Sequence, residues 1–207
     1  LDGTSEESYS YDDTIVRCFL TATLLWGFVA AVAAVLVTST LLHPRLGAGV
    51  EWLSFGRLRP VGVMLFFVAF LGNGIFAGIY YSTQRLAKTR MWSGVLSWLH
   101  FLSWQVIIVA AMITLPMGIT QGREFGEAEW PIDLVTTLVW MLFFAANFFM
   151  TLMQRRVRRL YVSLWFYIAA VVAVGLVNLC TLFVFPTAGW KSDSLATGVQ
   201  DALLQCW

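Results

Sequence analysis

Five long apolar stretches, each bounded by polar or charged residues, occupy most of this chain. They cover approximately residues 15–42, 55–85, 92–115, 132–153 and 161–185. About 20 consecutive apolar residues let an α-helix cross the hydrocarbon core of a bilayer. The pattern therefore predicts an all-α fold, a polytopic membrane bundle of five transmembrane helices followed by a C-terminal amphipathic segment.

Polar segments at the two ends set the predicted domain boundaries. The domains are a polar, acidic N-terminal tail (1–14), the five-helix transmembrane bundle (15–186) and a periplasmic C-terminal segment (187–207). In the tail, Asp12, Asp13 and Thr14 are suited to cap the first helix, because their side-chain oxygens accept hydrogen bonds from first-turn amides. In the last segment, residues 192–207 have the pattern of an amphipathic helix.

Composition agrees with a membrane protein and excludes two other classes. Of the 207 residues, 59% are hydrophobic and only 12% are charged, too few charges to cover a water-facing surface. The formal net charge of +1 argues against nucleic-acid binding. The three cysteines, Cys18, Cys180 and Cys206, lie far apart without metal-ligand spacing, so we interpret them as packing residues.

The distribution of basic residues predicts the orientation in the membrane. Eight of the 13 basic residues fall on one predicted side: Arg17, Arg85, Lys88, Arg90, Arg155, Arg156, Arg158 and Arg159. Cytoplasmic loops carry the excess of lysine and arginine. This pattern places the N-terminus in the cytoplasm and the acidic loop before the fourth span in the periplasm.

Two features inside the spans bear on packing and chemistry. Gly74 and Gly78 form a small-xxx-small pair, which lets a neighbouring helix approach closely. His100 lies within the third span, where an ionisable residue is a functional candidate. It has no second histidine at helical spacing, so we expect it to pack or to form a hydrogen bond.

The second span carries a family resemblance. Its residues Phe55-Gly56-Arg57-Leu58-Arg59-Pro60, with Gly72-Asn73, Tyr80-Tyr81 and Gln84-Arg85 further on, resemble the second transmembrane helix of subunit I of cytochrome cbb-type haem–copper oxidases. In that family a histidine two residues after the Arg-Pro pair ligates the low-spin haem b. Here that position is Gly62, which has no side chain to bind iron.

The loop after the third span resembles the same family. It reads Leu115-Pro116-Met117-Gly118 and continues through Glu124-Phe125 and Glu127 to Glu129-Trp130-Pro131-Ile132-Asp133. In the family this loop lies beside the haem propionates and contributes to a calcium site, so the resemblance implies Glu124 and Glu127 as calcium ligands. Because no haem ligand is present to bring propionates to the loop, we favour the other interpretation, a solvated acidic loop that caps the fourth helix through Glu129 and Asp133.

The resemblance extends to the chain's last residue, Trp207, but not to the metal ligands. The chain contains two histidines, His43 and His100, whereas the family uses two for haem b and three for copper. The histidine of the family's fifth helix is also absent from residues 177–182, and the sequence stops where the copper-binding motif would begin. We therefore expect no cofactor in this chain, with calcium at Glu124 and Glu127 as the alternative.

These observations favour a non-catalytic accessory subunit derived from subunit I of a cbb-type cytochrome c oxidase. It would pack with other membrane subunits of an electron-transfer complex, cytochrome c-type subunits among them, in the bacterial inner membrane. The alternative is the N-terminal piece of a split catalytic subunit that oxidises cytochrome c and reduces oxygen. An unrelated small-solute transporter is disfavoured, because the spans show no charges near their midpoints.

Overall fold

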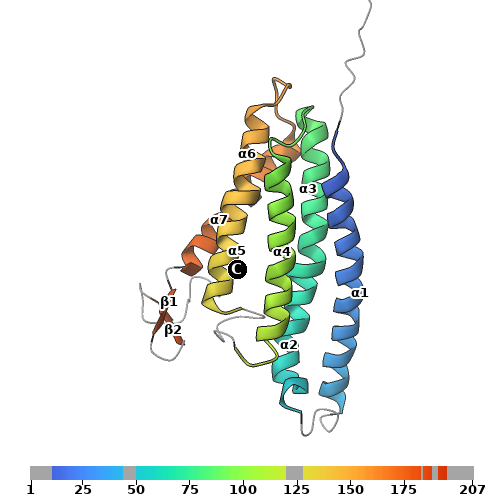
Figure 1. Cartoon of the computed structure of the whole chain (residues 1–207), viewed down its shortest axis with the longest axis vertical. Coiled ribbons are helices and arrows are strands. Elements are labelled where there is room, and N and C mark those ends of the chain that lie inside the picture. Colours follow the sequence, from blue (N-terminus) through green and yellow to red (C-terminus); the bar gives the residue numbers. More distant parts are fainter. Residues whose placement is uncertain (1–10, 44–49, 120–127, 183, 188–190, 195–207) are drawn as a thin grey trace, which may run out of the picture.

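Five helical spans stand side by side and alternate in direction in the computed structural model of this protein (Figure 1). The structure describes residues 11–43, 50–119, 128–182, 184–187 and 191–194. The spans are α1 (Thr14–Leu42), α2–η3–α3 (Phe55–Met64, Leu65–Leu71 and Gly72–Ala87), α4 (Gly94–Thr114), α5–η4–α6 (Trp130–Leu138, Val139–Ala145 and Ala146–Met153) and α7 (Val162–Leu182). Each is long and apolar enough to cross a membrane, which confirms the predicted fold class.

The bundle has two ends that differ in what they hold. At the first, which we name the N-terminal end, the chain enters α1, α3 turns into α4, and α6 leads towards α7 (Figure 1). The opposite end, which we name the far end, holds the start of α2 and the last turn of α4. A short 3-10 helix, η2 (Glu51–Leu53), precedes α2 at the far end.

Two of the spans contain a π-helical segment near their middle. In η3 the N–H of Gly72 donates to the carbonyl of Phe67, five residues back, and in η4 the N–H of Ala146 donates to Met141. Each segment widens its helix locally and changes the direction of the side chains around it. The sequence pattern, which marks only length and polarity, does not predict either segment.

Aromatic side chains form the centre of the bundle. Phe76 of α3 has ring centroids of five neighbours within 6 Å: Phe19, His100, Trp104, Trp140 and Phe144. These neighbours come from α1, α4 and η4, so one ring joins three other spans. Rings in tilted and edge-to-face arrangements stabilise such contacts beyond the area that they bury.

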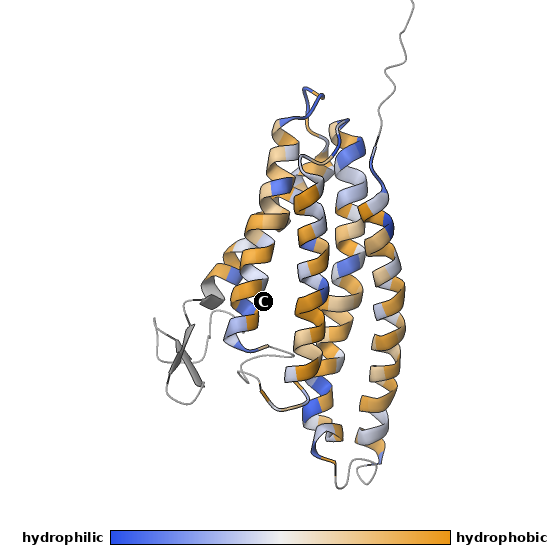
Figure 2. Ribbon diagram, viewed as in Figure 1, coloured by the Kyte–Doolittle hydropathy of each residue, from blue (hydrophilic) through white to orange (hydrophobic). Residues whose placement is uncertain are grey.

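The outer surface is also apolar, as a bilayer requires. Hydrophobic residues predominate along the spans, and many of the hydrophilic ones lie near the ends (Figure 2). On α1, for example, Leu24 is 77% exposed and Phe28 is 73% exposed.

Within the bundle, Gln105 links α3 and α1: its Nε2 donates to Asn73 Oδ1 at 2.8 Å, and its Oε1 accepts from Trp26 Nε1 at 2.7 Å. Side-chain hydrogen bonds of this kind hold membrane helices together.

Pro60 lies inside α2, a position that a membrane helix tolerates. Two details of the predicted elements need correction. The last span ends at Leu182, and a short antiparallel hairpin of β1 (Val184–Thr187) and β2 (Lys191–Ser194) follows it. Residues 192–194, expected in an amphipathic helix, thus belong to a strand, and residues 195–207 lie outside the described part.

The two glycines of the small-xxx-small pair have different surroundings. A Cβ added at Gly74 would lie 3.5 Å from Thr23 Cγ2, so this position meets α1. Around a Cβ at Gly78, no atom of the described residues lies within 4 Å. Contact between Gly78 and a helix therefore stays a prediction, and it concerns a helix of another chain or segment.

We expect Gly74→Leu to destabilise the bundle by about 1–3 kcal/mol, because the leucine side chain would extend into α1 beyond Thr23. Gly78→Leu is the matched control and should leave the thermal stability of the purified chain unchanged. Thermal unfolding of both variants in the same detergent measures the difference. Equal loss of stability in the two variants would show that the chain packs at both glycines alike.

Candidate functional site

The position of the expected haem ligand is half-buried in α2. A Cβ on Gly62 would lie 3.5 Å from Val37 Cγ2, so this side of the helix faces α1. One turn further on, Phe66 and Phe67 are exposed, and their rings meet edge to face with centroids 5.0 Å apart. The turn of helix after Gly62 therefore presents an exposed aromatic surface, formed by Phe66 and Phe67.

The two histidines of the chain lie on other helices than Gly62. His43 is the exposed C-cap residue of α1, and His100 is fully buried in α4. Within the described ranges, no group of three or more histidine, cysteine, aspartate or glutamate side chains could hold a metal ion. The described residues therefore bring together no metal-binding cluster.

His100 occupies the aromatic centre of the bundle. Its Nδ1 lies 3.2 Å from the hydroxyl of Tyr80, within hydrogen-bond distance, and its ring stacks on Phe144 with centroids 5.1 Å apart. Its Nε2 is buried and has no hydrogen-bond partner among the described residues. His100 thus packs among aromatic rings and lies within hydrogen-bond distance of Tyr80, as the sequence predicts.

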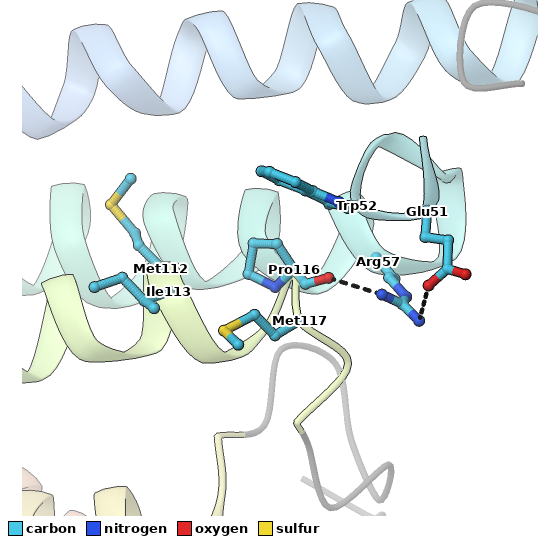
Figure 3. Close-up of a pocket in the computed structure, with 7 residues that line it drawn as sticks. All are labelled: Glu51, Trp52, Arg57, Met112, Ile113, Pro116 and Met117. Atoms are coloured by element: carbon cyan, nitrogen blue, oxygen red, sulfur yellow. Dashed lines mark hydrogen bonds and ion pairs between the residues drawn. The ribbon is translucent and has the colours of Figure 1, made fainter. Parts of the chain in front are cut away.

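The two motifs that carry the resemblance meet in space at the far end. Arg57 Nη1 donates to the carbonyl of Pro116 at 3.3 Å, across 59 positions of sequence (Figure 3). Gly118 follows with φ at +80°, a conformation that favours glycine, and a Cβ there would lie 3.4 Å from Arg57 Cζ. The glycine of the loop motif thus allows both the turn and the close approach of the arginine.

The acidic residues expected to bind calcium, Glu124 and Glu127, lie outside the described residues. Calcium binding there stays a prediction. Glu129 does begin α5 as its N-cap, but its side chain makes no capping hydrogen bond. Its main-chain carbonyl instead accepts hydrogen bonds from the N–H groups of Ile132 and Asp133, so main-chain hydrogen bonds form the first turn of this helix.

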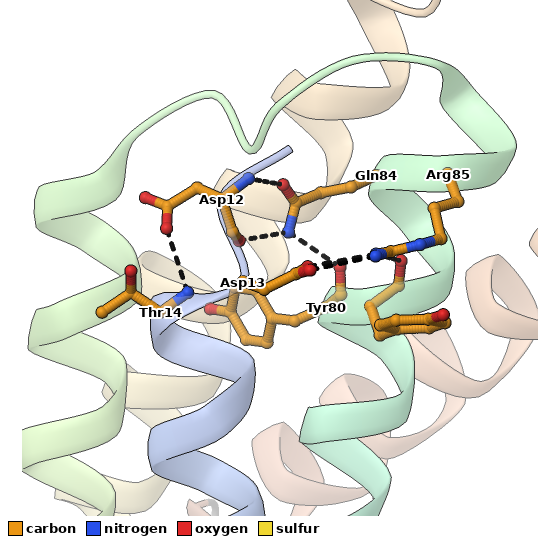
Figure 4. Close-up of polar contacts among 7 residues, drawn as sticks. Asp12, Asp13, Thr14, Tyr80, Gln84 and Arg85 are labelled. Atoms are coloured by element: carbon orange, nitrogen blue, oxygen red, sulfur yellow. Dashed lines mark hydrogen bonds and ion pairs between the residues drawn. The ribbon is translucent and has the colours of Figure 1, made fainter. Parts of the chain in front are cut away.

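A second polar cluster ties the N-terminal segment to the end of α3 (Figure 4). Asp12 N–H donates to Gln84 Oε1 at 3.1 Å, and Gln84 Nε2 donates back to the carbonyl of Asp12 at 2.9 Å. The Asp13 carboxylate accepts two hydrogen bonds from Arg85: Nη1 donates to Oδ1 at 3.1 Å and Nη2 donates to Oδ2 at 3.0 Å. Asp13 was expected to cap α1, but its side chain makes no capping bond, whereas Asp12 Oδ1 accepts from Thr14 N–H.

Both carboxyl groups of this cluster titrate below their ordinary range. The hydrogen bond from Arg85 lowers the pKa of Asp13, and the hydrogen bonds from Thr14 lower the pKa of Asp12. The ordinary value is 3.8 for each. A lowered pKa means that the ionised carboxylate stabilises the folded state above this value and that the stabilisation disappears as the pH falls below it.

We therefore expect Asp13→Asn to unfold at a slightly lower temperature than the unmodified chain at pH 7. The difference should shrink as the pH is lowered through 3.8, because protonation removes the same charge from Asp13. The effect is small, because both side chains of the ion pair are about one third exposed and solvent screens their attraction. Thermal unfolding of both proteins between neutral and acidic pH measures it. A difference that stays constant with pH would contradict the ion-pair explanation.

Comparison with known proteins agrees with the residues that meet at this site. Over residues 14–207 the chain matches the family described as Cytochrome C and Quinol oxidase polypeptide I. It is 38% identical, over 200 residues, to the Cbb3-type cytochrome c oxidase subunit CcoN1 of Stutzerimonas stutzeri; the match covers 97% of this chain and 42% of the relative. It is 35% identical, over 202 residues, to cytochrome c oxidase subunit 1 of Rhodobacter capsulatus, covering 95% of this chain and 38% of the relative. The chain spans about two fifths of the length of these curated relatives.

Proposed function

Because this chain belongs to the Cytochrome C and Quinol oxidase polypeptide I family, we propose that it is a non-catalytic membrane subunit related to the N-terminal part of subunit I of cbb-type oxidases. One observation carries the proposal. Gly62 stands at the position where the family resemblance expects the histidine of haem b. Iron needs a donor atom from a side chain, and glycine has none.

The surroundings of Gly62 support a structural role. Phe66 and Phe67 form an exposed aromatic surface next to it, which suits contact with another helix or with lipid. His100 is engaged with Tyr80 and surrounded by aromatic rings, which suits a packing role. The chain thus retains a packed scaffold and a surface that can support a neighbouring subunit.

The five membrane-length helices and the bacterial relatives support a multi-pass protein of the bacterial inner membrane. We propose other membrane subunits of an oxidase or related electron-transfer complex as partners, cytochrome c-type subunits among them. The outer faces of α1 and α7 are largely apolar and exposed, with Phe28 and Phe166 as examples. Such faces are available to subunits or to lipid.

A split catalytic subunit is the second candidate function. It is favoured by the continuous match over residues 14–207 and by the contact between Arg57 and Pro116, which joins both family motifs. In that case the metal ligands that the family resemblance expects would lie outside the residues of this sequence. The two functions differ in whether b-type haem stays with this chain.

A reduced-minus-oxidised optical spectrum tests the proposal. The full chain is purified with its co-purifying membrane subunits and then separated from them, and spectra are recorded at both stages. We expect no b-type haem band in the separated chain, whatever haem the partners carry. A stoichiometric b-type band that stays with this chain would overturn the non-catalytic function. The variant His100→Phe would then show whether His100 is the ligand.

We further propose that the N-terminus lies in the cytoplasm, as the basic residues near Arg85 and Arg156 indicate. A cysteine introduced as Gly122→Cys, in a chain whose own cysteines are replaced by serine, should react with an impermeant reagent from the periplasm. The control is a cysteine introduced as Lys88→Cys in the same background, which should react with the reagent only after the membrane is permeabilised. The reverse pattern would invert the orientation.

A further inference from the structure

A half-open groove lies at the far end of the bundle, between η2, the start of α2 and the end of α4 (Figure 3). Its volume is about 580 Å³. It is lined by Glu51, Trp52, Arg57, Met112, Ile113, Pro116 and Met117. The proposed function makes no use of this groove.

One part of the groove carries a pair of opposite charges at the end of the apolar spans. Arg57 Nη2 lies 3.3 Å from Glu51 Oε2, and the Glu51 side chain is 82% exposed. Arg57 Nη1 is held by the carbonyl of Pro116 at 3.3 Å, which fixes the guanidinium in place. A guanidinium has five N–H donors and a carboxylate has two oxygens, so each group retains capacity for a further partner.

The rest of the lining is apolar although it faces outward. Ile113 and Met117, near the end of α4, are largely exposed, as is the indole of Trp52. Tryptophan is enriched at the level of the lipid headgroups, where its ring is partly apolar and partly polar. An acyl chain that runs along Ile113 and Met117 would cover this surface, while the charges stay at headgroup level.

We propose that this groove binds one phospholipid whose headgroup carries both a phosphate and a primary ammonium, as in phosphatidylethanolamine. The phosphate accepts hydrogen bonds from Arg57, and the ammonium donates to Glu51, so four charges of alternating sign lie together. Charge-assisted hydrogen bonds are the stronger class, and arginine matches the phosphate geometry.

The charge pair also discriminates between headgroups. Phosphatidylglycerol brings a negative phosphate without a cation, and Glu51 would repel it. Phosphatidylcholine brings a quaternary ammonium, which has no N–H to donate to Glu51. The groove should therefore prefer phosphatidylethanolamine over both.

Native mass spectrometry of the full chain in mild detergent tests this preference. The protein is delipidated and mixed with equal amounts of phosphatidylethanolamine, phosphatidylcholine and phosphatidylglycerol that carry the same acyl chains. We expect one phosphatidylethanolamine to be retained about fivefold more often than either other lipid, because the headgroup adds one hydrogen bond to a charged group. Equal retention of the three lipids, or preference for phosphatidylglycerol, would overturn the proposal.

Substitutions locate the effect. Glu51→Gln should abolish the preference for phosphatidylethanolamine over phosphatidylcholine and leave the total lipid retained nearly unchanged. Glu129→Gln removes the same charge outside the groove lining and should leave the preference intact. Arg57→Gln should reduce retention of all three lipids at this site. A preference that survives Glu51→Gln would sink the proposal even if Arg57→Gln fails to fold.

Discussion

The Phe76→Ala variant is expected to lose roughly 2–4 kcal/mol of stability, because alanine leaves a cavity at the meeting point of four spans. Phe76 is only 2% exposed, and its ring centroid lies 4.4 Å from that of His100 and 4.9 Å from those of Trp104 and Phe144. Tightly packed rings cannot close such a cavity without leaving their own contacts. In a membrane protein the unfolded helices stay in lipid, so the cavity and the lost dispersion contacts account for most of the cost.

Phe28→Ala is the matched control for Phe76→Ala. Phe28 lies on α1 and is 73% exposed, so its removal opens no cavity inside the bundle. Thermal or chemical unfolding in one detergent compares the two variants. We expect Phe28→Ala to unfold at the same temperature or denaturant concentration as the unmodified chain, and Phe76→Ala to unfold at a clearly lower one. Equal effects would mean that the aromatic centre does not carry the packing of the bundle.

The second large effect is expected from Asn147→Leu, which replaces a buried amide in α6 by an apolar side chain of similar size. Asn147 Nδ2 donates to the Ser93 carbonyl at 3.1 Å and to Ser97 Oγ at 2.9 Å, and its Oδ1 accepts from Ser93 N–H at 3.0 Å. These three hydrogen bonds attach the start of α4 to α6. Leucine would leave the Ser93 backbone groups without these partners, at a cost of about 2–4 kcal/mol.

Thr38→Val is the control for Asn147→Leu. It also replaces a polar side chain by an apolar one of similar size, but the Thr38 hydroxyl donates to the carbonyl of Ala34 in its own helix, at 2.8 Å. Unfolding of both variants by heat in detergent should show a large loss for Asn147→Leu and little change for Thr38→Val. If the two variants unfold together, the link from Asn147 to α4 is not needed for stability.

The sequence alone determined the number and approximate extent of the spans and showed that Gly62 stands where the family resemblance expects a haem ligand. Length and hydropathy suffice for the spans, because a bilayer imposes a minimum apolar length on any helix that crosses it. The motif that begins at Phe55 is enough to identify Gly62, because the position in question lies two residues after Pro60 and is found by counting along the sequence. Both inferences use only local order in the sequence.

Only the tertiary structure decided which side chains meet. Asp12 and Gln84 are 72 positions apart, and Arg57 and Pro116 are 59 apart. Gly74 meets α1, whereas Gly78 has open space around it in the described structure. The physical reason is that an apolar side chain is equally at home towards lipid and towards another helix, so hydropathy does not mark the buried face of a membrane helix. The choice of faces depends on the packing of all the spans together.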